Sequence, residues 1–292
     1  MAGYLERLAE RSAGVGSVLC LGLDPDPTAL PPGFPATVAG IERFCLLLLD
    51  AAGPYAAAVK PNLAFFEAFG APGIAALERI RAAVPSSILL IADAKRGDIG
   101  STAGRQAVAL FDGLGADAIT ASPYVGAEGL APFLERTDRY VYVLCRTSNP
   151  GSDELQGLPV AADPATGAPS EPLHERVARR VALWGPGGTV GLVVGATAPI
   201  EMGRIRAIAP GLGFLVPGVG AQGGEVGPVL AHGPATAPPA GGRAGGGLLV
   251  NVSRGIARAG FEVAPDSPAD PGERIARAAS NWSTTLAVPV LS

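Results

Sequence analysis

ILLIADAKRGDIGST, residues 88–102, joins an apolar run directly to a group of alternating charges. Residues 88–92 predict a short buried strand because the run is brief, apolar and rich in isoleucine and leucine. Successive side chains of a strand point to opposite sides, so Asp93 and Lys95 should project from the same side. Charges at a buried strand end are unfavourable unless they pair with each other and with a bound group. This stretch therefore predicts either a structural ion pair or the charged centre of a ligand site.

Seven further segments are similarly short and β-rich, and helical stretches separate them. The eight predicted strands cover residues 17–23, 57–60, 88–94, 116–121, 140–146, 189–194, 213–217 and 247–252. Apolar residues recur at helical spacing between them, as at Ile74, Leu77, Ile80 and Val84 and at Leu173, Val177, Val181 and Trp184. Eight strand–helix units predict a closed parallel (β/α)8 TIM barrel. We expect one domain over residues 1–292, with an open doubly wound sheet as the alternative fold.

Two stretches rich in glycine, proline and polar residues lack this periodicity. Residues 149–170 form a long connection after the fifth predicted strand, and connections of that length are usually lids or disordered. Residues 233–247, GPATAPPAGGRAGGG, predict a flexible surface insertion with no chemistry of its own.

The composition argues against several classes of partner. The formal net charge is −4 and the sequence holds no basic block or aromatic-rich basic stripe, so we expect no nucleic-acid partner. Residues 1–14 lack the apolar core of a secretory signal, and no stretch is apolar for long enough to cross a bilayer. The sequence therefore predicts a cytoplasmic protein without a membrane contact.

The cysteines and histidines predict neither a metal site nor a cofactor. Cys20, Cys45 and Cys145 are widely spaced within apolar runs, which is typical of buried free thiols. His174 and His232 are the only histidines, and neither stands in a cluster with metal-ligand spacing.

Polar residues gather where the predicted strands end, which is where TIM barrels place their active sites. Asp24 ends the first strand and Lys60 the second, while Ser148 and Arg254 follow the fifth and eighth. Any one of these could be a solvated cap of a loop. Several at equivalent strand ends indicate a shared site.

The last two strand ends predict an anion site. VPGVGAQGG, residues 216–224, contains glycines that let backbone N–H groups approach a ligand closely. NVSRGI, residues 251–256, ends the next strand. The loops after strands seven and eight are the usual phosphate site of this barrel, and Arg254 could supply a bidentate contact.

Six motifs together resemble the family of orotidine 5'-monophosphate decarboxylase, the last enzyme of pyrimidine nucleotide synthesis. They are LGLDPD, VKPN, DAKRGDIGST, RTSNPG, VPGVGAQGG and NVSRGI, which follow the family's order from residue 21 to residue 256. The residues of these motifs are similar to those of the longer bacterial branch of the family. The resemblance implies decarboxylation of orotidine 5'-monophosphate to uridine 5'-monophosphate and CO2 without a cofactor.

The resemblance also implies roles for individual residues. Lys60, Asp93, Lys95 and Asp98 are implied to form the reacting charge network, with Lys95 stabilising and protonating the carbanion at C6. Asp98 is implied to reach the neighbouring site across a homodimer interface. The residues implied to bind substrate are Asp24 and Thr102 at the ribose, Ser148 at the pyrimidine, and Gln222 and Arg254 at the phosphate, with Pro217 lining the pocket.

Two rival functions are compatible with parts of the pattern. A related sugar-phosphate decarboxylase that uses magnesium also carries an Asp-x-Lys-x-x-Asp string. Lys60 argues against it, because those relatives are expected to place a metal-binding carboxylate at the second strand end. The chain could also be a barrel that binds a phosphorylated ligand without chemistry, since a fold does not fix a function.

Overall fold

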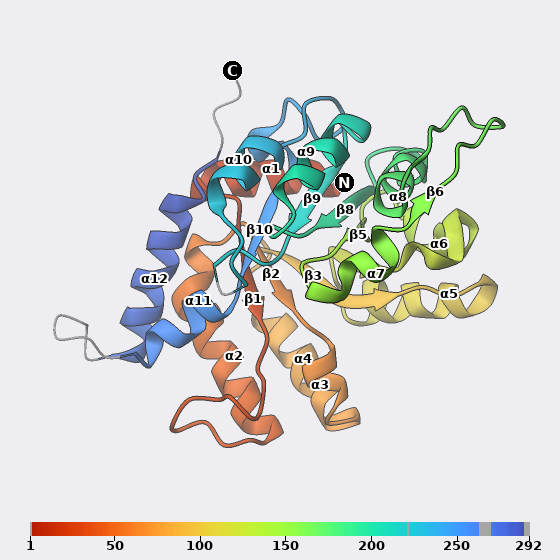
Figure 1. The fold of residues 1–292 in the computed structure, drawn as a ribbon. Helices are drawn as coiled ribbons and strands as arrows, with labels where there is room; N and C mark the ends of the chain where they lie inside the picture. The colour runs from red at the N-terminus through yellow and green to blue at the C-terminus, as the bar shows by residue number, and fades with distance from the viewer. Residues whose placement is uncertain (1, 221, 263–269, 289–292) are drawn as a thin grey trace.

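The protein is described from a computed structural model that covers residues 2–220, 222–262 and 270–288 (Figure 1). Eight parallel strands close into a barrel in the order β1-β10-β9-β8-β5-β4-β3-β2. The strands are β1 (Leu19–Leu23), β2 (Ala58–Pro61), β3 (Leu89–Arg96), β4 (Ala118–Ala121), β5 (Tyr140–Arg146), β8 (Val190–Val194), β9 (Gly213–Val216) and β10 (Leu249–Val252). The predicted TIM barrel is confirmed. The open-sheet alternative is wrong because β1 pairs with both β2 and β10.

Helices surround the barrel, as Figure 1 shows. The longer ones are α1 (Tyr4–Val15), α2 (Val38–Ala52), α4 (Ala71–Ala83), α5 (Gly100–Ala107), α6 (Gly126–Leu134), α8 (Leu173–Val181), α9 (Pro199–Ile208), α10 (Val226–His232) and α12 (Pro271–Thr285). Short α3 (Ala64–Glu67), α7 (Asp153–Gln156) and α11 (Arg254–Ala257) follow strand ends. Side-chain caps fix two of these helix starts, since Thr37 accepts from Gly40 N and Asp270 accepts from Glu273 N.

The amino end of the barrel is filled by apolar and aromatic side chains. Tyr4, Leu5 and Leu8 of α1 pack against the residues inside the barrel. The ring of Tyr4 stacks on that of Tyr140 with 4.7 Å between centroids. Cys20 lies in the same cluster, and all three cysteines are buried and free, which confirms the prediction for them. Burial raises the pKa of the Cys20 thiol to about 12, so it stays protonated and inert.

The predicted helix stripes are confirmed in part. Leu77 and Ile80 on α4 and Val84 just after it are buried as expected, whereas Ile74 is 37% exposed. The buried face of α8 is made by His174, Ala178 and Val181, so this stripe is rotated relative to the predicted one. Two contacts hold His174 on this face: its backbone carbonyl accepts a hydrogen bond from Cys145 Sγ, and its ring nitrogen Nδ1 lies 2.9 Å from the carbonyl oxygen of Gln156.

Residues 233–247 do not form the exposed surface insertion that their composition predicts. The segment joins α10 to β10 and closes on itself, with Ala235 N donating to the carbonyl oxygen of Gly246 at 2.9 Å. Gly245, Gly246 and Gly247 are buried, and a β-carbon on Gly245 would lie 3.0 Å from Val18 Cγ1. The segment therefore packs at the amino end of the barrel, away from the strand ends that were predicted to bind phosphate.

Residues 149–170 contain more regular structure than the sequence predicts. After α7, the strands β6 (Pro159–Val160) and β7 (Glu171–Pro172) pair as a short antiparallel hairpin. Glu171 is buried and forms ion pairs with Arg176 and Arg179 at 2.7 and 2.8 Å. These ion pairs tie the base of the hairpin to α8. A lid role for this segment stays a prediction.

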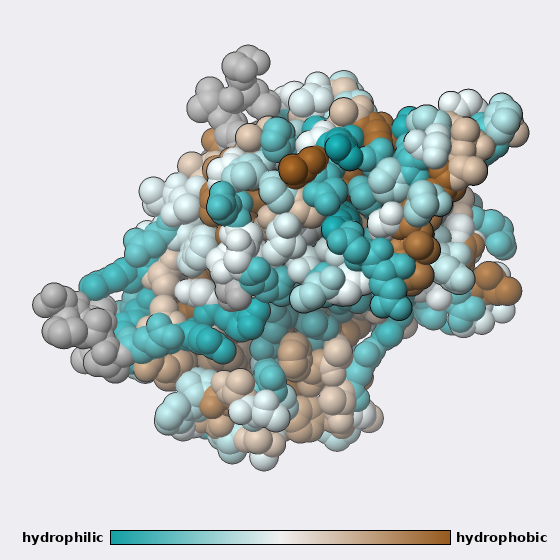
Figure 2. All heavy atoms as spheres, viewed as in Figure 1, coloured by the Kyte–Doolittle hydropathy of each residue, from teal (hydrophilic) through white to brown (hydrophobic). Residues whose placement is uncertain are grey.

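The surface seen in Figure 2 mixes hydrophilic and hydrophobic residues, with the strongly hydrophobic ones scattered in small groups. No helix in the described part of the chain combines the length and the apolar character that crossing a bilayer requires.

Candidate active site

Two lysines share one carboxylate at the carboxyl end of the barrel. Lys60 Nζ on β2 lies 2.9 Å from Asp93 Oδ2, and Lys95 Nζ on β3 lies 2.7 Å from Asp93 Oδ1. The Lys60 side chain is 6% exposed and that of Lys95 is 49% exposed. The structure thus brings three of the four predicted network residues into one cluster, in which only Lys95 extends well into open space.

The electrostatics of the cluster keep its buried members charged. Burial lowers the pKa of Lys60, but the negative charges of Asp93 and Asp24 outweigh it and leave the pKa above the usual lysine value. Burial likewise raises the pKa of Asp93, and the ammonium groups of Lys60 and Lys95 more than reverse this, so the pKa lies well below its usual range. The pair is therefore ionised at neutral pH.

Thr120 at the end of β4 completes the cluster and was not among the residues predicted from the sequence. Its hydroxyl donates to Asp93 Oδ1 at 2.8 Å and accepts from the backbone N–H of Lys95 at 3.0 Å. Lys95 has a φ of 48°, in the left-handed region that non-glycine residues seldom adopt. Thr120 therefore helps to fix an unusual backbone turn that aims Lys95. Its position at the end of a predicted strand, like that of Asp24 and Lys60, could have marked it as a candidate site residue.

A cavity of about 280 Å³ opens above this cluster. Lys60, Asp93, Lys95, Thr120, Ser148, Pro217 and Gln222 are among the residues that line it. Ser148 and Gln222 converge over Gly218, where a β-carbon would lie 3.0 Å from both Ser148 Cβ and Gln222 Oε1. Gly218 has a φ of 98°, so a glycine suits this turn both in conformation and in size. The predicted pyrimidine and phosphate residues are thus neighbours in space.

The loop that carries Ser148 is held by Gln156, which was also not among the predicted residues. Gln156 of α7 accepts from Thr147 N through Oε1 and donates through Nε2 to Thr147 Oγ1, both at 2.8 Å. This two-point contact fixes the first turn after β5. The contact could not be predicted from the sequence, because nothing in the local pattern links Gln156 to Thr147 nine residues earlier.

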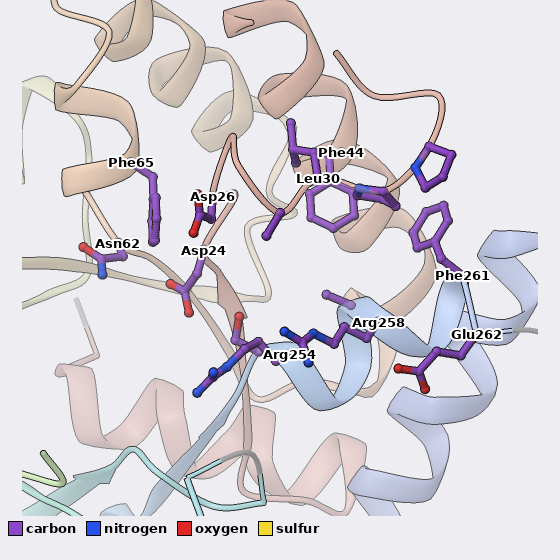
Figure 3. A pocket seen from close by; sticks show the side chains of 15 residues that line it. Asp24, Asp26, Leu30, Phe44, Asn62, Phe65, Arg254, Arg258, Phe261 and Glu262 are labelled. Atoms are coloured by element: carbon purple, nitrogen blue, oxygen red, sulfur yellow. The ribbon is translucent and has the colours of Figure 1, made fainter. Parts of the chain in front are cut away.

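A second cavity of about 560 Å³ lies beside the first, between the ends of β1, β2 and β10. Asp24, Asn62, Ser253, Arg254 and Arg258 line its polar part. Figure 3 shows Asp24 and Arg254 on the barrel side and the rings of Phe44 and Phe261 opposite them. Oδ1 of Asp24 is buried without a hydrogen-bond partner, which is a costly state that a ligand hydroxyl would relieve.

Asp98 and Thr102 are not brought to this cluster within one chain. Asp98 accepts from Ile99 N at 2.8 Å and lines neither cavity, and Thr102 is exposed on α5. The backbone of Asp98 lies against α6, where a β-carbon on Gly129 would come 2.9 Å from its carbonyl oxygen. Both residues therefore lie outside the cavity that their own Lys60–Asp93–Lys95 cluster lines.

The arrangement suits a reaction on a small anionic molecule. The mouth of the barrel holds the half-exposed ammonium of Lys95 and the carboxylate of Asp93. The glycine-containing loop that carries Gln222 lines the same cavity. Within residues 2–220, 222–262 and 270–288, no group of three or more histidine, cysteine, aspartate or glutamate residues is arranged to hold a metal ion. Fold and site together define an enzyme of the TIM-barrel class, with its charged cluster at the carboxyl ends of the strands.

Comparison with known proteins narrows this class to one family. The profile of the orotidine 5'-phosphate decarboxylase / HUMPS family matches residues 17–264, and the chain belongs to this family. Relatives named orotidine 5'-phosphate decarboxylase include one from Herpetosiphon aurantiacus, 44% identical over 87% of this chain and 88% of its own. Another, from Thermomicrobium roseum, is 46% identical over 87% of this chain and 86% of its own.

Solved structures agree with these relatives. The structure of Leishmania donovani OMP decarboxylase superimposes with a TM-score of 0.77 at 41% identity, covering 97% of this chain and 99% of that one. An inhibitor complex of orotidine 5'-monophosphate decarboxylase from Methanocaldococcus jannaschii gives a TM-score of 0.61 at 18% identity, covering 92% of this chain and 98% of that one. The second likeness concerns the fold alone.

Proposed function

We propose that the protein converts orotidine 5'-monophosphate to uridine 5'-monophosphate and CO2. The observation that carries the proposal is the Lys60–Asp93–Lys95 cluster within a single cavity at the mouth of the barrel. Family membership and the similarity to named decarboxylases support the same reaction.

The chemistry of the reaction explains why an ammonium group is needed. Loss of CO2 from C6 leaves an electron pair in the plane of the pyrimidine ring, where conjugation cannot spread it. A fixed cation beside C6 stabilises this charge and can then donate the proton that completes the product. Lys95 suits this role because its ammonium is accessible, whereas Lys60 is almost fully buried.

The other members of the cluster serve Lys95. Asp93 holds the Lys95 ammonium at 2.7 Å, and Lys60 holds the opposite oxygen of Asp93 at 2.9 Å. A carboxylate bound from both sides cannot rotate freely, so the reacting ammonium is positioned before substrate arrives. Such preorganisation is the largest single source of rate enhancement in many enzymes.

The remaining predicted residues would bind the two ends of the nucleotide. Ser148 lies beside Gln222 over Gly218, which is compatible with a pyrimidine contact next to the phosphate cradle. Asp24 would bind the ribose hydroxyls through its unpartnered oxygen, and Arg254 would bind the phosphate together with Gln222. Binding energy from the distant phosphate can order the loops and so raise the rate at C6.

The magnesium-dependent sugar-phosphate reaction is disfavoured by the end of β2. Lys60 places a buried positive charge there, 2.9 Å from Asp93. A divalent cation bound by Asp93 would be repelled by both neighbouring ammonium groups. A barrel that only binds a ligand would not require an accessible ammonium held in place by a buried ion pair.

The decisive test follows the ultraviolet absorbance of the orotate ring when pure protein meets orotidine 5'-monophosphate in EDTA. We expect the absorbance to fall with the wild-type protein and to stay constant with Lys95→Ala. Stable absorbance with the wild-type protein, or turnover of a sugar phosphate that requires added magnesium, would reject the proposal.

We also propose that the protein works as a homodimer in which Asp98 and Thr102 enter the partner's site. Ile99 and Tyr124 are 61% and 95% exposed, which is unusual for large apolar side chains. They lie close to Asp98, because Gly97 approaches Ser122 and Val125. A second copy covering this face would bury both side chains. A cytoplasmic location stays a prediction from the sequence.

A further inference from the structure

The indole of Trp282 on α12 lies against both loops of the predicted phosphate site. A β-carbon on Gly220, in the loop after β9, would lie 3.3 Å from Trp282 Cη2 and 3.4 Å from Cζ2. A β-carbon on Gly255, in the first turn of α11 after β10, would lie 3.1 Å from Trp282 Nε1. One ring therefore contacts a glycine from each of the two loops.

Both glycines stand next to residues that the site uses. Gly220 has a φ of 72° and lies two residues before Gln222, in a turn closed by hydrogen bonds from Gly223 N to Gly220 O at 2.8 Å and from Gly224 N to Gly218 O at 3.0 Å. Gly255 directly follows Arg254. The indole therefore lies against the backbone segments that carry Gln222 and Arg254.

The surroundings of Trp282 leave room for such a shift. A cavity of about 350 Å³ adjoins the ring and is also lined by Val226, Gly255 and Asn281. Trp282 is only partly buried, although it packs against the main hydrophobic core. The packing around the ring is therefore incomplete on the side of this cavity.

We propose that Trp282 is a positioning residue for substrate phosphate, which sets the separation of the loop 216–224 from the start of α11. It makes no contact with the reacting carbon, and it acts through Gln222 and Arg254. The inference rests on the proposed phosphate role of those two residues. On this proposal, the absence of a side chain at Gly220 and Gly255 is needed because the Trp282 ring approaches both positions closely. Gly220 is also suited to the turn by its positive φ.

The test compares kcat/KM for orotidine 5'-monophosphate with kcat/KM for orotidine, the nucleoside without phosphate. Trp282→Ala should lower kcat/KM at least tenfold for the nucleotide and change it less than twofold for the nucleoside. Trp282→Phe should lose about threefold or less for the nucleotide. Trp184→Phe replaces the only other tryptophan and is the matched control, with both values unchanged. An equal loss on both substrates, or no loss at all, would overturn the proposal.

The Arg254→Ala variant separates this inference from the proposed phosphate site. It should lose about thirtyfold or more for the nucleotide alone, on the scale of one charged contact. Combining it with Trp282→Ala should add little further loss, because both changes act on the same phosphate. If Arg254→Ala loses nothing, the phosphate role of Arg254 is wrong. If only the Trp282 variants lose nothing, the positioning role is wrong.

Two further experiments test the inference if Trp282→Ala folds poorly. One measures the effect of Gly255→Ala with and without Trp282→Phe, and the other follows the fluorescence of Trp282. Gly255→Ala should lower kcat/KM severalfold in the wild-type background and have little effect when combined with Trp282→Phe, which lacks Nε1. In a Trp184→Phe background, uridine 5'-monophosphate should change the fluorescence of Trp282, and Arg254→Ala should abolish the change. An unchanged loss from Gly255→Ala in both backgrounds, or constant fluorescence at saturating nucleotide, would contradict the proposal.

Discussion

Lys60 and Lys95 bind the same carboxylate, but they differ in how deeply they are buried and therefore in their proposed roles. The Lys60 side chain is almost fully buried against Asp93, while half of the Lys95 side chain is exposed. A buried ammonium fixes the geometry of its partner, whereas an accessible one can meet a substrate. The difference arises from the register of the barrel, in which Lys60 pairs with Gly22 inside the β2 strand and Lys95 lies in the irregular end of β3.

Replacing the accessible lysine tests the proposed chemistry directly. Lys95→Ala should abolish measurable turnover, because Lys60, the other ammonium of the described cluster, is only 6% exposed and is held by Asp93. Binding of uridine 5'-monophosphate, measured by calorimetry, should persist because Gln222 and Arg254 are unchanged. Wild-type turnover in this variant would remove Lys95 from the mechanism.

The hydroxyl of Thr120 is expected to support the orientation of Lys95. Thr120→Val removes one hydrogen bond to a buried carboxylate and one acceptor for Lys95 N, at a cost of about 1–3 kcal/mol. We expect kcat to fall about tenfold or more, with a smaller effect on nucleotide affinity. Thr120→Ser keeps the hydroxyl and is the control. Equal kcat values for the valine variant and the wild-type protein would show that the hydroxyl is dispensable.

The depressed pKa of Asp93 predicts a defined dependence of stability on pH. Because the folded-state pKa lies below the unfolded value of about 3.9, the charged group stabilises the fold above that value. The contribution is lost as pH falls toward the folded-state pKa. The difference in unfolding free energy between wild-type protein and Asp93→Asn should be constant from about pH 5 to 7 and shrink below about pH 4. Urea denaturation at each pH measures it, and a difference that grows in acid would contradict the assignment.

At the scale of elements, the two ends of the barrel have different tasks. The carboxyl end carries the charged cluster and the loops with Ser148, Gln222 and Arg254. The amino end is closed by α1 and by the buried turn of residues 245–247. Changes at the amino end should therefore affect stability, and changes at the carboxyl end should affect catalysis.

Two glycines in the segment 233–247 test this division. Gly246 has a φ of 55°, and a β-carbon there would lie 2.8 Å from Ala235 N, whereas Gly242 has a φ of 80° with open space around it. Gly246→Ala should lose about 2–4 kcal/mol of stability through strain plus crowding, and Gly242→Ala about 1 kcal/mol through strain alone. Thermal unfolding measures both, and kcat should be unchanged in each. A fall in kcat without unfolding would show that this segment communicates with the site.

At the scale of the whole molecule, the proposed dimer completes each site with Asp98 from the partner chain. Lys95→Ala and Asp98→Ala chains should each be inactive, and mixing them should restore one intact site in each heterodimer. Activity near a quarter of the wild-type value is expected after full exchange, since half of the dimers are mixed and each has one working site. Persistent inactivity after subunit exchange verified by mass spectrometry would mean that Asp98 acts within its own chain or only in structure.

Much of the fold was predictable from local pattern. The eight barrel strands begin and end within two residues of the expected bounds, because buried parallel strands are short apolar runs bounded by glycine, proline and polar residues. Lys60, Asp93, Lys95, Ser148, Pro217 and Gln222 could be assigned to one site for a related reason, since parallel strands of a barrel end on the same face. Asp24 and Arg254 were also placed at this end, although they line the neighbouring cavity.

The sequence by itself determined the barrel and the charged strand ends, since these depend on alternation and spacing within a few residues of chain. Only the tertiary structure decided that Thr120 binds Asp93, that Gln156 binds Thr147 and that Trp282 lies between Gly220 and Gly255. It also decided that the glycine-rich segment 233–247 is packed instead of exposed. Such contacts join residues far apart in the chain or depend on the direction of one side chain, and no local periodicity records them.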